Sequence, residues 1–432
     1  VFSVADTVSK SAGGTFDGNI TAAGTITVTG NADLNGDLDV DGTTNLDAVD
    51  VDGAVNFAAD VTFATGADII TASAGTSNVR VGVNAGNALA SGSFYNVLVG
   101  EQAGEAITVG DYNIAIGHQA LEAMTGGQTN IAIGYQALQA ANVSSGEQNN
   151  VAIGYLAGND ITTGTLNTLV GSNAGDALDT GEGNTALGRN ALGKDTKGDL
   201  SVAIGYAALG NQNNSSNVDA QNTAVGFNAG GAILTGTANL LIGANAGANI
   251  TTGGGNIILG HSEGSAAGTN HQIIMGNSQV AGVGQDNFTF GRASLDSNIA
   301  FGATSISAPS DERLKEDIQD ETIGLAFINE LRPVTFQWKK EKDIPSDMKA
   351  YVADSETRVM NGKYNHGFIA QEVKSVIDKY DIKDGLGLWL ESGEDKRQRL
   401  AEGELIPFLV KAVQELSAKN DALEARIKTL EG

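Results

Sequence analysis

Residues 113–129 read NIAIGHQALEAMTGGQT, and residues 130–138 begin the same pattern again as NIAIGYQAL. The five-residue opening recurs twelve times between residues 78 and 276, in forms that include NVRVG, NVLVG, NVAIG, NTLVG, SVAIG, NLLIG and QIIMG. The closing glycines are mostly 17 residues apart, with single spacings of 16, 18, 20 and 21. A fixed period of this length is the signature of a solenoid, in which each unit is one coil.

Each unit opens with a short alternating pattern. Ile114 and Ile116 face one way, whereas Asn113 and Ala115 face the other, as in a β-strand. Seventeen residues suit two short strands and two turns, which is one coil of a parallel β-roll. The asparagine recurs in ten of twelve units, so its amides can form a ladder from coil to coil. The closing glycines permit positive φ or close backbone approach. They are Gly82, Gly100, Gly117, Gly134, Gly154, Gly171, Gly188, Gly205, Gly226, Gly243, Gly260 and Gly276.

Each coil contains few apolar residues for a solenoid that would be stable as a monomer. Twelve coils spaced about 4.8 Å apart give a shaft of roughly 55 Å. Each contributes two branched residues, an alanine and an occasional leucine. We therefore predict that residues 78–280 form a twelve-coil β-roll and that three chains pack their rolls around a common axis as a homotrimer.

Two stretches of the repeat resemble a known family. NNVAIGYLA at 149–157 and LSVAIGYAA at 200–208 are similar to the head repeat of trimeric autotransporter adhesins. The resemblance implies a trimeric left-handed β-roll. The coil is longer here than in those adhesins, and we expect no C-terminal membrane barrel.

Residues 1–77 have a different pattern, in which apolar residues alternate with Asp, Asn and Thr between glycines. Short alternating strands with Gly turns predict an intertwined β-prism or triple β-helix. Their aspartates have a spacing compatible with calcium ligation and also with a solvated acidic fibre face, and we predict no metal site and no cofactor. These aspartates are Asp33, Asp37, Asp39, Asp41, Asp47, Asp50 and Asp52.

Composition changes near residue 309. All four prolines and both tryptophans lie at or after Pro309, and residues 1–309 carry 6 basic and 26 acidic side chains. This acidic surface excludes nucleic-acid binding led by phosphate contacts. No apolar run approaches the roughly 20 residues of a membrane-spanning helix, so no membrane insertion is expected. No secretory signal is visible, and the absence of cysteine excludes disulfides. Residues 281–309 are predicted as a β connector.

After residue 309 three motifs follow in order: SDERLKEDI from 310, GFIAQEV at 367–373 and a helical tail from about residue 402. Together they resemble the endosialidase-type intramolecular chaperone domain, a self-cleaving peptidase family at the C-termini of bacteriophage tail fibres and tail spikes. The resemblance implies an α+β domain, with a core at 310–400 and a coiled coil at 401–432. In that family the domain assembles three chains, lets the β-shaft wind, and is cut off by a Ser-Lys dyad.

Carried over, the resemblance places the nucleophile at Ser310, the base at Lys315 and the scissile bond between Pro309 and Ser310. The chemistry suits these residue types, because a neutral lysine amine can take the proton of a hydroxyl. The alternative is an ordinary helix N-cap before ERLKEDI. Pro309 makes the residue before the cut rigid, and His366 is expected to be structural. At most, therefore, we expect a single-turnover peptidase and no other enzymatic activity.

The tail carries a strict 3-4 heptad seam that predicts a coiled coil. By itself its composition favours two strands, but the family and the β-roll argue for three. The seam residues are Ile406, Leu409, Val413, Leu416, Asn420, Leu423, Ile427 and Leu430.

These features predict a bacteriophage tail fibre on the virion, assembled in the host cytoplasm and joined at its N-terminus to tail or baseplate proteins. A bacterial trimeric adhesin on the cell surface is the alternative, and a glycan depolymerase has less support because the coils carry no long insertion. The host partner is a cell-surface glycan or protein.

An aromatic stripe follows the closing glycines and either stacks on sugars or fills the junction between chains. It comprises Tyr135, Tyr155, Tyr206 and Phe227, with His118 and His261 in the same column.

Overall fold

The structure of the chain is a computed structural model that describes residues 75–264, 266–293, 295–380, 382, 386–392 and 396–432. The predicted β-prism and its aspartates fall on residues 1–74, outside the described part.

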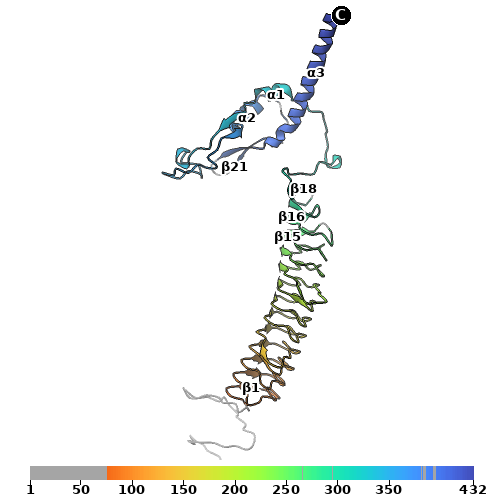
Figure 1. Ribbon diagram of the computed structural model, residues 1–432, viewed down its shortest axis with the longest axis vertical. Helices are drawn as coiled ribbons and strands as arrows, with labels where there is room; N and C mark the ends of the chain where they lie inside the picture. Colours follow the sequence, from red (N-terminus) through yellow and green to blue (C-terminus); the bar gives the residue numbers. More distant parts are fainter. Residues whose placement is uncertain (1–74, 265, 294, 381, 383–385, 393–395) are drawn as a thin grey trace, which may run out of the picture. The chain divides into compact units, whose positions relative to one another are not determined.

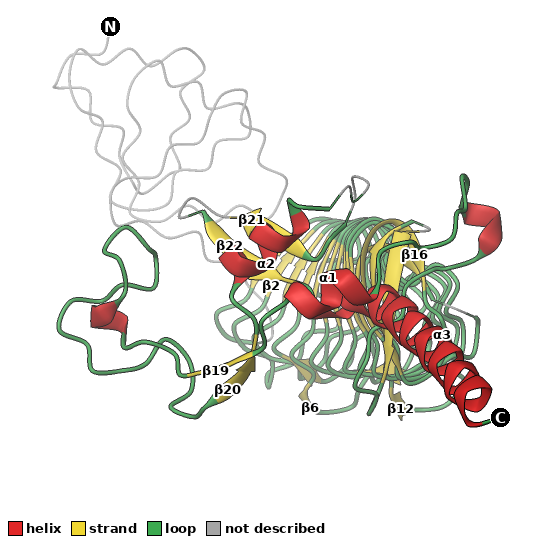
Figure 2. Cartoon of the chain, turned by 90° about the horizontal axis from the view of Figure 1, so that it is seen from above, coloured by secondary structure: helices red, strands yellow, loops and turns green. Residues whose placement is uncertain are grey.

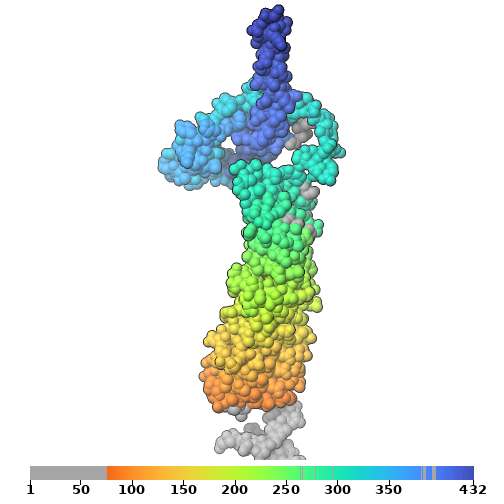
Figure 3. Space-filling model, turned by 45° about the vertical axis from the view of Figure 1, so that its right-hand side comes forward, coloured from red at the N-terminus to blue at the C-terminus, as the bar shows by residue number. Residues whose placement is uncertain are grey.

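The repeat folds into a β-solenoid of about twelve turns, as predicted. Its coils stack in sequence order from β1 to β16 (Figure 1) and form one continuous column in the space-filling view, from orange to green (Figure 3). One strand from each coil joins a single 14-stranded sheet, parallel up to β17 and closed by antiparallel β18. Its strands are β1 Val79–Val81, β2 Val97–Val99, β3 Ile114–Ile116, β5 Ile131–Ile133, β7 Val151–Ile153, β8 Thr168–Val170, β9 Thr185–Leu187, β11 Val202–Ile204, β13 Thr223–Val225, β14 Leu240–Ile242, β15 Ile257–Glu263, β16 Ile273–Ala281, β17 Asn287–Arg292 and β18 Leu295–Ala300.

The prediction of two strands in each coil is wrong for most coils. Among the described residues, a second strand occurs in four coils, as the pairs β4 (Gly127–Gln128) with β6 (Gly146–Glu147) and β10 (Gly198–Asp199) with β12 (Val218–Asp219). Viewed along the stack, β6 and β12 lie on a different side from the main sheet (Figure 2). In the other coils the described residues after the first strand form turns and bends.

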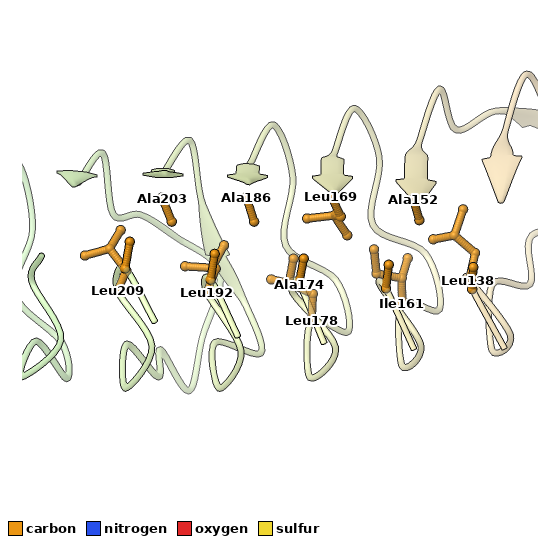
Figure 4. Packing of buried hydrophobic residues seen from close by; sticks show 14 of the residues in the cluster. Leu138, Ala152, Ile161, Leu169, Ala174, Leu178, Ala186, Leu192, Ala203 and Leu209 are labelled. Atoms are coloured by element: carbon orange, nitrogen blue, oxygen red, sulfur yellow. The ribbon is translucent and has the colours of Figure 1, made fainter. Parts of the chain in front are cut away.

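The strand alternation is confirmed, and the structure shows which face is inside. In β3 the central Ala115 is fully buried, whereas Ile116 is 37 % exposed. The same holds along the stack: the central residue points inward toward a leucine or isoleucine of the opposite corner (Figure 4). The branched first and third residues of each strand therefore form a half-buried to exposed apolar row along the outside of the sheet.

The coils from β1 to β14 each bury a leucine or isoleucine at a corner, and the position that supplies it alternates. Leu121 and Leu192 supply it directly at a left-handed corner position. Where that position is Gly158 or Gly175, a residue three places later replaces it; a Cβ on Gly158 would lie 3.2 Å from Ile161. Two coils of the first kind and two of the second make a unit of 71 or 72 residues that occurs twice, from Gly117 to Gly188 and from Gly188 to Gly260.

The predicted asparagine ladder is present and lies inside the coil. Asn113 is fully buried; its backbone N–H donates to Asn96 Oδ1 at 2.9 Å, and its own Oδ1 accepts from the backbone N–H of Asn130 at 3.0 Å. Its Nδ2 donates to the carbonyl of Gly127 at 2.9 Å. The amides therefore join backbone groups of successive coils, which satisfies polar atoms that would otherwise be buried alone.

One coil replaces the ladder asparagine with other polar groups, while its Leu209 stays fully buried. Ser201 occupies the ladder position, and Gln212 reaches it, with Nε2 3.2 Å from Ser201 Oγ while Oε1 accepts from Asn222 Nδ2 at 2.8 Å. Gln212 also donates to Asp195, whose buried carboxylate accepts from the backbone N–H groups of Gly198 and Asn214. This network gives the buried carboxyl oxygens of Asp195 hydrogen-bond donors.

The closing glycines are required for both reasons that the sequence predicts, which are positive φ and close approach of the backbone. Gly171 has φ of +138°, and a Cβ there would lie 2.6 Å from the carbonyl oxygen of Gly188 in the next coil. We expect Gly171→Ala to destabilise the shaft by at least about 3 kcal/mol, because backbone strain and a backbone clash add. Gly146→Ala is the matched control, since Gly146 has φ of +102° and open space around its Cβ position. Thermal unfolding followed by circular dichroism should show a much smaller loss for the control, and equal losses would contradict the clash.

The segment after the solenoid is mixed α and β. A core of Phe327, Val373, Val376, Leu388, Leu405 and Phe408 holds it together. Its elements are η1 Glu312–Leu314, α1 Leu325–Glu330, β19 Val334–Phe336, η2 Glu341–Asp343, β20 Asn365–Gly367, α2 Ala370–Ile377, β21 Trp389–Ser392, β22 Arg397–Leu400, η3 Glu402–Leu405 and α3 Ile406–Glu431. In the described part of the chain, no helix is both long and apolar enough to cross a membrane.

Candidate functional site

The candidate cleavage site lies where the chain leaves the sheet. After β18 the chain turns back, and Ser307 exchanges two backbone hydrogen bonds with Asn298, at 2.7 and 2.8 Å. Pro309 follows, then Ser310 and the short helix η1. Pro309 and Lys315 border an open hollow, whose other lining residues are Leu295, Asp296, Ser297, Ala308 and Leu314. The two sides of the Pro309–Ser310 bond are therefore close to folded structure while remaining accessible.

The motif after Ser310 forms a single turn of 3₁₀-helix, so the expected α-helix is absent here. Its cap is Asp311, whose carboxylate accepts from the Arg313 backbone N–H at 2.9 Å and pairs with the Arg313 guanidinium at 2.6 Å. The guanidinium lowers the pKa of the Asp311 carboxyl below its usual range. Because Asp311 performs the capping, the hydroxyl of Ser310 is left for another partner.

That partner is Lys315. Its Nζ lies 2.8 Å from Ser310 Oγ, so the structure brings together the two residues that the sequence singled out. The contact depends on the turn, since five residues separate the pair and η1 reverses the chain between them. Both residues are exposed in the single chain. The arrangement has the distance needed for proton transfer from hydroxyl to amine.

The second motif, GFIAQEV, spans the end of β20 and the start of α2. His366 lies opposite Thr335 in the antiparallel β19–β20 pair, and its side chain is exposed. Glu372 forms a two-pronged ion pair with Arg332, which lowers the pKa of the Glu372 carboxyl. These contacts tie α2 to the segment after α1, which is a structural role.

The first turns of α3 are part of the folded domain. Phe408 packs on Phe327 of α1, with ring centroids 5.3 Å apart, and Glu415 accepts from the backbone N–H of Leu325 at 3.0 Å. The side chains of the heptad seam do not take part in this packing. Its seven apolar side chains are all exposed in the single chain, from 44 % for Leu409 to 83 % for Leu430. A continuous row of exposed apolar side chains of this length is unusual on the surface of a monomeric protein.

The aromatic residues after the closing glycines form two separate stacks. His118, Tyr135 and Tyr155 are stacked with centroids 5.3 and 5.2 Å apart, and Tyr206 stacks on Phe227 at 5.5 Å. The guanidinium of Arg189 lies 6.0 Å from the Tyr206 ring and extends the second stack. His261 does not belong to this arrangement, because β15 continues through it where other coils have a corner.

Sequence reasoning missed the grouping into two stacks, the role of Arg189 and a further stacked pair, Tyr95 with Tyr112. The signal that could have found the grouping is the four-coil unit, because His118 and Arg189, Tyr135 and Tyr206, and Tyr155 and Phe227 are 71 or 72 residues apart.

Among the described residues, no group of three or more histidine and carboxylate side chains is placed to hold a metal ion.

Comparison with known families gives one match: residues 310–382 match the family described as the chaperone of endosialidase. Neither the curated proteins nor the solved structures contain a significant match to the chain. The match begins at Ser310, the residue after the candidate scissile bond, and covers both motifs. A fibre-like β-solenoid is thus followed by a segment of the endosialidase chaperone type.

Proposed function

We propose that the chain is the subunit of a homotrimeric bacteriophage tail fibre that attaches the virus to its host, and that residues 310–432 direct its trimerisation and folding. The observation that carries the proposal is the match to the chaperone family at the end of a β-solenoid whose apolar surfaces are unpartnered. Host attachment and a place on the virion rest on the family resemblance.

Two exposed apolar surfaces support three-fold assembly. One is the outward row of branched residues on the sheet, which includes Val81 at 55 % exposure and Leu187 at 48 %. The other is the α3 seam. Burial of each such side chain between chains would contribute about 1.5–3 kcal/mol, and three chains repeat every contact. Threading three solenoids together requires a fixed register, and a coiled coil at one end supplies it before winding begins.

The same proposal includes self-cleavage. Ser310 Oγ attacks the carbonyl carbon of Pro309, and Lys315 takes the hydroxyl proton. The C–N bond between Pro309 and Ser310 breaks, its nitrogen becomes the protonated N-terminus of the released fragment, and Pro309 is left as an ester on Ser310 Oγ. Water then hydrolyses the ester and leaves a carboxylate on Pro309. Assembly would bury the dyad and so favour the neutral amine that the first step needs.

The alternative, a bacterial trimeric adhesin, is favoured by the repeat alone, which resembles adhesin heads. The adhesin alternative does not explain why a chaperone-type segment follows the shaft. A survey of the neighbouring genes separates the two, because tail and baseplate genes would flank a fibre gene.

Light scattering of the purified protein, beside its intact mass, tests the assembly. We expect a trimer, which is three times 44.1 kDa or about 132 kDa while uncut. Leu416→Gln should weaken it, because the seam loses about 1.5–3 kcal/mol per chain. Ala418→Gln introduces the same side chain on the outer face of α3 and should leave the trimer intact. A monomer at micromolar concentration in the unmodified protein would refute the proposal.

A further inference from the structure

Each aromatic stack ends at a small residue. The corner column, the residue directly after each closing glycine, reads His118, Tyr135, Tyr155, Ser172 and then Arg189, Tyr206, Phe227, Ala244. The register is fixed by backbone hydrogen bonds, since Asn173 N–H donates to Tyr155 O at 2.9 Å and Asn190 N–H donates to Ser172 O at 3.0 Å. Ser172 and Ala244 therefore stand where the next ring of each stack would lie.

The ring beside each small residue is the more exposed member of its stack. Tyr155 is 53 % exposed against 42 % for Tyr135, and Phe227 is 57 % exposed against 45 % for Tyr206. Rings inside a stack have both faces covered by neighbours, so they present only their edges to a ligand. Tyr155 and Phe227 are terminal rings, each stacked against a neighbouring ring on one face.

The space over Ser172 has the thickness of one ring. Tyr155 and Arg189 are two coils apart, which is about 9.6 Å at the spacing of paired strands. The rings already stacked are 5.2–5.5 Å apart between centroids, so one further ring placed over Ser172 would contact Tyr155 on one side and the Arg189 guanidinium on the other. The position over Ala244 repeats the platform with Phe227, and the residue of the next coil in the same column, His261, lies in β15.

We propose that these two positions, over Ser172 and Ala244, each bind one neutral hexopyranose ring of a cell-surface polysaccharide. The apolar C–H face of such a ring matches the negatively polarised face of Tyr155 or Phe227. Hydroxyl groups at the sugar edge meet polar atoms, since Ser172 Oγ lies 3.0 Å from Asn173 Oδ1 and Arg189 is exposed. The acidic shaft, with 6 basic against 26 acidic side chains, disfavours anionic sugars.

The inference rests on the proposed function, because a host glycan is the receptor class expected for a fibre. Two positions on one chain lie four coils apart, about 19 Å. A polysaccharide can span them, and a trimer presents three such pairs. Single sites of this kind are weak, and linked sites gain affinity through effective concentration.

Binding of the full-length protein to immobilised dextran, mannan and galactan tests the proposal, with alginate as the anionic comparison. We expect at least one neutral polymer to bind and alginate not to bind. Tyr155→Ala with Phe227→Ala should lower the apparent affinity on the order of tenfold or more, because the platforms are lost and avidity with them. Ser172→Tyr with Ala244→Tyr should do the same while keeping every native ring, because the new side chains fill the two positions.

Tyr95→Ala with Tyr112→Ala is the matched control, because that pair is also stacked and each ring is 56 % exposed. Failure of all three neutral polymers to bind, or unchanged binding in the filled variant, would overturn the proposal. So would loss of the trimer in the Tyr155 and Phe227 variant, since the rings would then belong to the junction between chains. Light scattering and cleavage of the unmodified protein report on the proposed function separately.

Discussion

Synthesis of the chain without residues 310–432 should yield aggregated or monomeric shaft in place of a soluble trimer. The strands of the solenoid are mostly three residues long, and every coil leaves branched apolar residues on its outer face. In the proposed assembly, this row and the strand edges at the end of the stack stay exposed until three chains meet in register, which favours aggregation over correct winding. The α3 seam is the part of the described chain that can bring three copies together before the shaft forms.

The control for this deletion is the full-length Ser310→Ala protein, which keeps residues 311–432 unchanged. It should remain soluble and trimeric in light scattering, because assembly depends on packing and not on the hydroxyl. A soluble trimer from the truncated gene would contradict the proposed chaperone role.

Self-cleavage should depend on both members of the dyad. The unmodified chain is expected to yield a shaft ending at Pro309 and a fragment of 123 residues, read by intact mass. Ser310→Ala and Lys315→Ala should each abolish the cut, because one removes the nucleophile and the other removes its base at 2.8 Å. Lys315→Arg should fail as well, since a guanidinium keeps its proton.

Asp311→Asn is the matched control, because its amide oxygen can still cap η1 while the ion pair with Arg313 is lost. It should cut at a rate much closer to that of the unmodified chain than the dyad variants do. Full-length protein from the unmodified gene would remove the peptidase role and leave the chaperone role standing.

Local sequence pattern was sufficient for the solenoid. Twelve openings with a 17-residue period predict coils, alternation predicts the strand, and the recurring asparagine predicts the ladder, because each depends on residues a few positions apart or in equivalent positions of the next coil. The pairing of Ser310 with Lys315 was also predictable, although from family resemblance, and the 3₁₀ turn that makes it possible was not.

Only the tertiary structure decided which face of the strand is inside. The alternation of Ile114, Ala115 and Ile116 is compatible with either face. In this coil the small central residue faces inward, because the interior also holds Asn113, Leu121 and Met124. The same stacking brings together side chains about 17 residues apart, which turns single aromatics into two stacks and leaves gaps at Ser172 and Ala244. Contacts between coils depend on the register of the whole stack, so residues such as Gln212 and Ser201 become partners through folding rather than through their place in the sequence.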